Sequence, residues 1–82
     1  MANSLHDHRY KRLIELVVEA RLDAELTQRD VAKRLRVPPS YIAKVETLQR
    51  RIDFVELVDL LTALRVNVTH FLRTALQELH RR

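Results

Sequence analysis

The sequence contains no cysteine and no glycine, and its only prolines are the adjacent Pro38 and Pro39. Without cysteine, the chain can form no disulfide bond, no thiolate metal site and no thiol nucleophile. Without glycine, it lacks the residue that most readily adopts the tight turns of β-hairpins. Leucine, alanine, arginine and glutamate, which favour helices, are abundant instead. The composition therefore predicts an all-α fold.

Long hydrophobic runs are also missing. No run approaches the roughly 18 apolar residues that a membrane span needs, and the N-terminal segment MANSLHDHRYKR has no apolar core of a signal peptide. Hydrophobic residues make up 46% of the chain and charged residues 32%, a balance typical of a folded globular protein. We expect a cytoplasmic protein with no membrane partner. It should form one domain over residues 7–82, after a flexible tail at residues 1–6.

The motifs of catalysis and metal binding are absent as well. The sequence has no nucleophile elbow, no phosphate-binding glycine loop and no paired acids in a predicted pocket. His6 and His8 flank Asp7 where the predicted tail ends, while His70 and His80 have no partner at the spacing of metal ligands. We therefore expect no metal, no cofactor and no small-molecule ligand, and we interpret the chain as not an enzyme.

The positive charge is concentrated in one third of the chain. Between Thr27 and Arg51 there are seven basic and two acidic residues, a net charge of +5, whereas the whole chain carries +4. A local excess of this kind is typical of proteins that bind a polyanion. Charge alone does not distinguish such a surface from a solvated helix face.

Apolar residues recur at helical spacing from residue 10 to residue 24. The stripe consists of Tyr10, Leu13, Ile14, Val17, Ala20 and Ala24. Asp7 is suited to the N-cap position before it. Leu16 and Val18 lie off the stripe, so this first helix has apolar residues available for a further contact.

Two short helices are predicted next. Thr27 and Asp30 have the spacing of a capping box, which predicts a helix of about two turns with Val31, Ala32 and Leu35 inward. A turn follows at residues 36–37, because a proline disfavours helical geometry in the residue before it. Pro39 suits a first helical position, so a helix should run from Pro39 to about Thr47. Its inward residues are Ile42 and Val45.

Two more helices complete the predicted domain. Asp53 and Glu56 form a second capping box. The expected core residues of the helix that follows are Phe54, Leu57, Leu60, Leu61 and Leu64. Thr69 should cap a last helix over about 69–81. The apolar residues of this last helix are Phe71, Leu72, Ala75, Leu76 and Leu79.

The stretch Leu26 to Glu46, LTQRDVAKRLRVPPSYIAKVE, resembles the helix-turn-helix of the XRE family, the Cro- and lambda-repressor-like regulators. The resemblance continues through residues 51–53, the leucine-rich fourth helix and residues 66–68. It implies a five-helix lambda-repressor-like DNA-binding domain with its helix-turn-helix at about 28–47. Ala32 supplies the small residue that two short, steeply crossing helices need at their contact.

The resemblance also implies the contacts with double-stranded DNA. The positions that face the bases in the major groove are Pro39, Ser40, Tyr41 and Lys44. Residues at the start of the first motif helix and in the loop after the second are expected to contact phosphates. They are Thr27, Gln28, Arg29, Thr47, Arg50 and Arg51. Pro39 stands where many relatives carry glutamine, so only apolar contact is expected there. We interpret Lys33 and Arg34 as solvated charges.

Two further expectations concern the fold. Relatives join an arginine near the end of the first helix to the glutamate that closes the second motif helix, which predicts a partly buried ion pair between Arg21 and Glu46. Arg36 and Leu48 stand where relatives commonly have glycine. Arg36 is therefore predicted to adopt a left-handed conformation at a cost of roughly 1 kcal/mol.

The last helix carries the signal for a partner. Leu72, Leu76 and Leu79 extend its apolar stripe, which predicts either a longer core helix or, as we prefer, a homodimer interface. A two-fold dimer would bind a palindromic operator as a transcriptional regulator. One alternative is an antitoxin that neutralises a toxin protein, for which Leu16 and Val18 remain available. Another is a protein-interaction adaptor that does not bind DNA.

Overall fold

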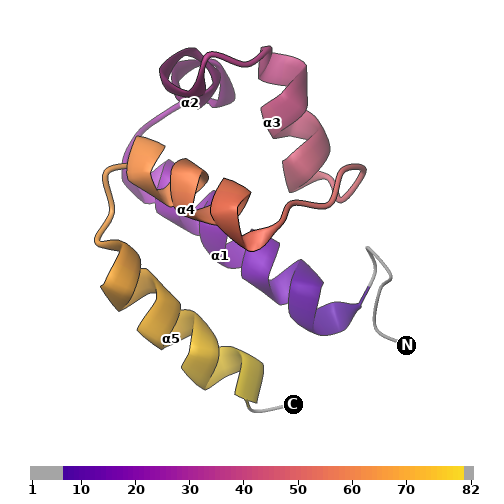
Figure 1. The fold of residues 1–82 in the computed structure, drawn as a ribbon, viewed down its shortest axis with the longest axis vertical. Coiled ribbons are helices and arrows are strands. Elements are labelled where there is room, and N and C mark those ends of the chain that lie inside the picture. Colours follow the sequence, from indigo (N-terminus) through magenta and orange to yellow (C-terminus); the bar gives the residue numbers. More distant parts are fainter. Residues whose placement is uncertain (1–6, 81–82) are drawn as a thin grey trace.

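The computed structural model describes residues 7–80, which form five helices and no strand (Figure 1). The helices are α1 (His8–Asp23), α2 (Gln28–Leu35), α3 (Pro39–Glu46), α4 (Phe54–Ala63) and α5 (Val68–His80). The pair α2–α3 lies at one end, α4 lies in the middle in contact with α2 and α5, and α5 lies at the other end (Figure 1). The all-α prediction is confirmed. The predicted tail at 1–6 lies outside the described residues.

The N-terminal caps explain where the helices begin. Asp7 Oδ1 accepts the backbone N–H of Arg9 at 2.8 Å, and both predicted capping boxes, Thr27 with Asp30 and Asp53 with Glu56, are present. The last helix differs from the prediction. Asn67 Oδ1, rather than the Thr69 hydroxyl, accepts an N–H of the first turn, that of His70 at 2.8 Å, so α5 begins at Val68. The prediction of Thr69 as the cap was wrong, and residue 81, its predicted end, lies outside the described residues.

Each of the first four helices is followed by a residue in the left-handed region. These residues are Glu25, Arg36, Leu48 and Arg65, with φ between 59° and 64°. In every case this residue donates its N–H to the carbonyl three positions back, and the next residue donates to the carbonyl five positions back. This Schellman pattern satisfies carbonyls that a helix end would otherwise leave unpaired. The predicted conformation of Arg36 is confirmed, and the same geometry recurs at the other three helix ends.

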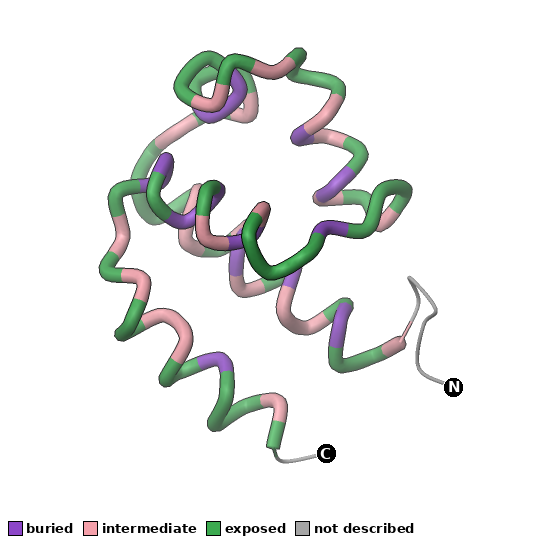
Figure 2. The backbone as a smooth tube through the Cα atoms, viewed as in Figure 1, coloured by how far each residue is buried: buried purple, intermediate pink, exposed green. Residues whose placement is uncertain are grey.

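The hydrophobic core lies between α1 and the three helices that follow it (Figure 2). Its most deeply buried side chains are Ile14, Val17, Val31, Ile42, Val45 and Leu61. Burial of each such aliphatic side chain stabilises the fold by about 1.5–3 kcal/mol. Phe54 was predicted to join this core, but the prediction was wrong: its side chain is 64% exposed. Phe54 is the first residue of α4, and no described residue buries its ring.

The last helix packs less tightly than the others. Ala75 is its one buried residue among those described, while Leu72 and Leu79 are half-buried and Leu76 is 63% exposed. A bidentate ion pair links α5 to the start of α1. Arg12 Nε lies 2.8 Å from Glu78 Oε1, and Arg12 Nη2 lies 3.2 Å from Glu78 Oε2. Helix α5 therefore leaves part of its apolar stripe on the surface. None of the described helices is both long and apolar enough to cross a membrane.

Candidate nucleic-acid interface

Helix α3 packs against the core on one side and is exposed to solvent on the other. Ala32 of α2 is buried at the contact with α3, and Ile42 and Val45 of α3 are buried in the core. The small side chain of Ala32 lets the two short helices approach closely. On the opposite side of α3, Ser40 and Lys44 are exposed, one turn apart. The outer face of α3 is therefore a rigid, solvent-exposed ridge.

The four predicted base-facing residues do not lie alike. Pro39, Ser40 and Lys44 are exposed, whereas Tyr41 is half-buried and packs against the edge of the core. The guanidinium of Arg50 lies over the Tyr41 ring, 4.8 Å from its centroid. The structure thus exposes three of the four, with Ser40 and Lys44 on the outer face of α3, and Tyr41 packs against Arg50.

The two loop arginines, which the sequence could not tell apart, point to different sides. Arg50 is fixed by Tyr41 and by Glu56, whose Oε2 lies 3.3 Å from Arg50 Nη2. Hydrogen bonding to Tyr41, and then to Glu56, raises the pKa of Arg50 above its usual value despite some desolvation. Arg51 instead lies over the ring of Tyr10, 4.4 Å from its centroid, toward the start of α1. Arg50 therefore flanks α3 more directly than Arg51 does.

The start of α2 offers donors to an anion. The capping box uses the N–H of Asp30, which donates to Thr27 Oγ1 at 3.0 Å, and the N–H of Thr27, which donates to Asp30 Oδ2 at 2.9 Å. Hydrogen bonds from the backbone N–H and from the side chain of Thr27 to the carboxyl of Asp30 lower the pKa of that carboxyl. Gln28 and Arg29 are the first two residues of the helix, so their N–H groups have no helical carbonyl one turn earlier to which they could donate. Together with the helix dipole they favour a phosphate at this position.

A cleft of about 540 Å³ lies beside this helix start. Its lining residues are Arg21, Leu22, Glu25, Leu26, Thr27, Gln28, Arg29 and Pro39. The cleft therefore joins the first turn of α2 to the first turn of α3. The lining combines the cation of Arg29, the carboxylate of Glu25 and the apolar side chain of Leu22.

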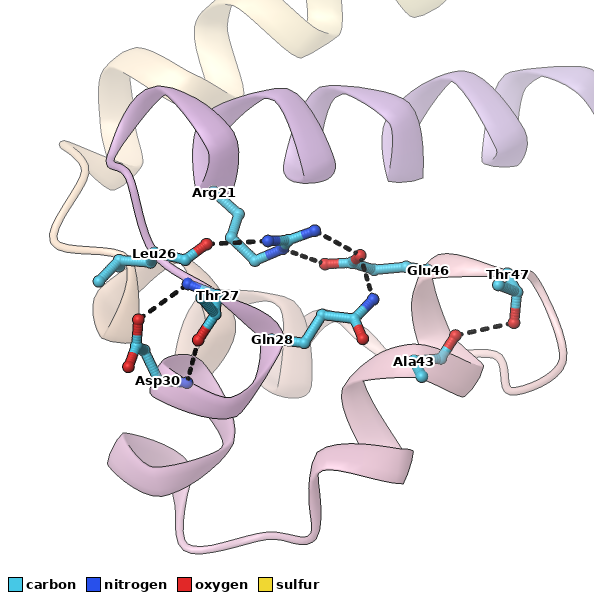
Figure 3. A network of polar contacts seen from close by, with 8 residues as sticks. All are labelled: Arg21, Leu26, Thr27, Gln28, Asp30, Ala43, Glu46 and Thr47. Atoms are coloured by element: carbon cyan, nitrogen blue, oxygen red, sulfur yellow. Dashed lines mark hydrogen bonds and ion pairs between the residues drawn. The ribbon is translucent and has the colours of Figure 1, made fainter.

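A buried polar network fixes the two motif helices to α1 (Figure 3). Arg21 Nε lies 2.7 Å from Glu46 Oε2, and Arg21 Nη2 lies 3.0 Å from Oε1, with only 12% and 9% of the two side chains exposed. Arg21 Nη1 also donates to the carbonyl of Leu26 at 2.8 Å. The predicted Arg21–Glu46 pair is thus present in the structure. It holds the last residue of α3 against α1.

Gln28 belongs to the same network, which the sequence did not indicate. Its Nε2 donates to Glu46 Oε1 at 2.8 Å, and its side chain is half-buried (Figure 3). The amide is therefore oriented before any ligand arrives. Gln28 is also the first residue of α2 and lines the cleft at the helix start.

Two other polar side chains have structural partners. Arg34, which we interpreted as a solvated charge, is exposed, and its Nη1 also donates to the carbonyl of Ala63 at the end of α4, at 2.6 Å. The contact places a cation at a helix C-terminus, where the dipole favours it. No local sequence signal indicates this pairing, because it depends on how α2 packs on α4. Thr47 is exposed, and its hydroxyl donates to the carbonyl of Ala43 at 2.7 Å (Figure 3).

Comparison with known proteins agrees with this geometry. Residues 17–71 match a family model described as helix-turn-helix. An XRE-family like protein from Pseudomonas syringae pv. tomato str. DC3000 is 33% identical, with 89% of each chain covered and a TM-score of 0.84. The chain belongs to the XRE family. No curated protein matches it.

Two solved structures of the restriction-modification controller protein C.Esp1396I share the XRE fold. A point mutant of that protein is 20% identical, covers 87% of this chain and 90% of its own, and has a TM-score of 0.76. The other is the tetramer of the controller protein in complex with its natural 35 base-pair operator. It is 21% identical, with 87% of this chain and 93% of that chain covered and a TM-score of 0.76.

Proposed function

We propose that this XRE-family DNA-binding regulator recognises an inverted repeat in the major groove as a homodimer. The observation that carries the proposal is the exposed outer face of α3, with Ser40 and Lys44 presented by a helix whose back is buried in the core. An α-helix fits the major groove, where each base pair presents a distinct pattern of donors and acceptors. Lys44 is suited to the O6 and N7 atoms of guanine, and Ser40 to either a donor or an acceptor edge.

Phosphate contacts hold this face in place. One set lies at the start of α2, where Gln28 and Arg29 border the cleft. The other lies beyond the end of α3, where Arg50 is held by Tyr41 and Glu56. The two sets flank α3, so the helix enters the groove between strands that are contacted on both sides. Such contacts set affinity and register, whereas the residues of α3 determine sequence preference.

The homodimer follows from the size of the site and from α5. One helix-turn-helix covers only a few base pairs, and a two-fold dimer places two of them about 34 Å apart on successive turns of the groove. Leu72, Leu76 and Leu79 provide the apolar stripe for the interface, because Leu76 is largely exposed and the other two are half-buried. The operator complex of the structurally similar controller protein contains a tetramer.

Selection of bound duplexes from a random DNA pool tests the proposal. We expect an inverted repeat whose half-site centres are about 10 base pairs apart. Lys44→Ala should relax the base preference at one position of each half-site, at about 1–3 kcal/mol for a well-formed contact. Arg50→Ala should weaken binding to all sequences alike and reduce the slope of log K against log salt by about 1.

The two variants control for each other, since both remove one exposed cation from the same region. Equal losses on every sequence would show that Lys44 does not read bases. A selected sequence without two-fold symmetry would contradict the homodimer. If no duplex associates at low ionic strength, the proposed function is wrong as a whole.

The structure adds little support for the two alternative functions, an antitoxin and an adaptor that does not bind DNA. Val18 was one of the residues left available for a toxin, but it packs against the core, and Leu16 is half-buried. A toxin partner therefore stays a prediction that these two residues do little to support. An adaptor without DNA binding would be expected to present an apolar patch on α3, where Ser40 and Lys44 are exposed instead.

A further inference from the structure

We propose that the first turn of α3 recognises the C5-methyl group of a pyrimidine, with Pro39 as the residue that contacts it. The inference rests on the proposed function and specifies one chemical feature of the operator. The methyl group belongs either to thymine or to 5-methylcytosine, and the experiment below separates the two.

The two prolines at the start of α3 offer no hydrogen-bond donor to a base edge. Pro38 and Pro39 are both exposed, and neither has a backbone N–H or a polar side-chain atom. The helix has no side-chain cap, and the carbonyl of Pro38 already accepts the N–H of Tyr41 at 2.9 Å. In the major groove the apolar feature of a base edge is the C5-methyl group. Pro39 is therefore complementary to a methyl group, while the exposed Ser40 beside it supplies a hydroxyl for polar contacts.

The same turn is rigid before it meets DNA. Pro38 has φ −66° and ψ 148°, and the ring of Pro39 fixes φ at the first helical position. Proline side chains lose almost no rotational freedom when they are buried. An apolar contact made by Pro39 thus has a low entropic cost. A long, flexible side chain at this position would lose more.

The position of Pro39 places the methyl contact within the site. Pro39 borders the cleft that Gln28 and Arg29 line at the start of α2. A strand whose phosphate is held there passes beside the proline ring. Ser40 and Lys44 lie on the outer face of α3, one turn apart, and supply the polar contacts. The half-site therefore has a methyl-bearing pyrimidine at the end near α2, followed by bases that are read through hydrogen bonds.

The test compares four forms of each pyrimidine position in the selected half-site. Duplexes carry T·A, U·A, 5-methylcytosine·G or C·G at that position in both half-sites. Loss of the methyl group should weaken binding by about fourfold per half-site, the effect of removing one buried CH₂-sized group from water. The background, T·A or C·G, in which the protein binds more tightly identifies the source of the methyl group.

Variants assign the effect to Pro39. Pro39→Ser should abolish the methyl dependence, whereas Pro38→Ser, the matched change at the neighbouring proline, should keep it. Lys44→Ala should lower the affinity for DNA but keep the dependence on the methyl group. Thermal melting checks that the variants are folded. The inference is overturned if no pyrimidine position depends on its methyl group, or if the dependence persists in Pro39→Ser. Either result leaves the selection of an inverted repeat intact, so it is distinguishable from failure of the proposed function.

Discussion

Glu46 is the residue on which the placement of α3 depends most directly. Its carboxylate accepts hydrogen bonds from Arg21 Nε, Arg21 Nη2 and Gln28 Nε2, at 2.7, 3.0 and 2.8 Å. These three donors come from α1 and α2, so one side chain connects three helices. Glu46→Ala would leave the Arg21 guanidinium largely buried without a counter-charge. We expect a loss of about 3–5 kcal/mol in the free energy of unfolding, measured by urea denaturation.

Two controls separate the buried pair from charge in general. Glu19→Ala removes a carboxylate that is 57% exposed and pairs with Arg12, and it should cost less than about 1 kcal/mol. Arg21→Ala combined with Glu46→Ala should cost less than the sum of the two single changes, since removing both partners leaves no uncompensated charge. If Glu46→Ala unfolds at the same urea concentration as the wild type, the pair does not stabilise the fold.

At this scale the sequence predicted the Arg21–Glu46 pair but not the residues that surround it. The pair followed from family positions. Family positions did not predict three other contacts: the hydrogen bond from Gln28 to Glu46, the hydrogen bond from Arg34 to Ala63 and the stacking of Arg50 on Tyr41. Each depends on the direction of a long side chain between helices that are distant in the sequence, and no local pattern encodes that direction.

The four left-handed helix ends are the element-scale feature with the clearest energetic consequence. A non-glycine residue in this region costs roughly 1–2 kcal/mol, and this chain has no glycine to avoid that cost. Arg36, between α2 and α3, is exposed, so its side chain contributes little packing. Arg36→Gly should raise the free energy of unfolding by about 1 kcal/mol and the melting temperature by about 4–8 °C.

Arg36→Ala is the matched control for this prediction. It removes the same charge but keeps the Cβ atom that makes the left-handed conformation unfavourable, so it should not stabilise the protein. Leu48→Gly offers a contrast, because Leu48 also packs against the core and its loss removes apolar contacts. A lower melting temperature for Arg36→Gly than for Arg36→Ala would show that relief of the backbone does not determine stability at this turn.

Helix boundaries were predicted well wherever a capping residue precedes a regular apolar stripe. Asp7, Thr27 and Asp53 each satisfy N–H groups of the helix that follows, as their spacing predicted. Two predictions were wrong at helix starts. Asn67 and Thr69 are both chemically able to cap α5, and the stripe did not show where its first turn begins. Phe54 matches the stripe of α4 but lies at the end of that helix, where the pattern cannot show that packing stops.

At the scale of the whole molecule, the excess of positive charge lies in one region, between Thr27 and Arg51. Basic residues surround α2, α3 and the loop after α3, whereas three glutamates surround Arg12 on α1 and α5. They are Glu15, Glu19 and Glu78, with contacts of 3.2, 3.2 and 2.8 Å. Helix α5 lies at the end away from α2 and α3 (Figure 1). A charge distribution of this kind orients a protein in the field of a polyanion before contact.

The same separation makes α5 available for self-association. An interface on α5 leaves the outer face of α3 uncovered, so dimerisation and DNA binding are compatible.

Leu76→Glu places a charge on the exposed part of the α5 stripe, at a side chain whose loss leaves the core intact. Sedimentation equilibrium should then show a monomer at concentrations where the wild type is a dimer, with an unchanged melting temperature extrapolated to low protein concentration. Leu22→Glu changes a comparably exposed leucine, 58% against 63%, on α1, and should remain dimeric. Loss of the dimer in both variants, or in neither, would place the interface elsewhere than on α5.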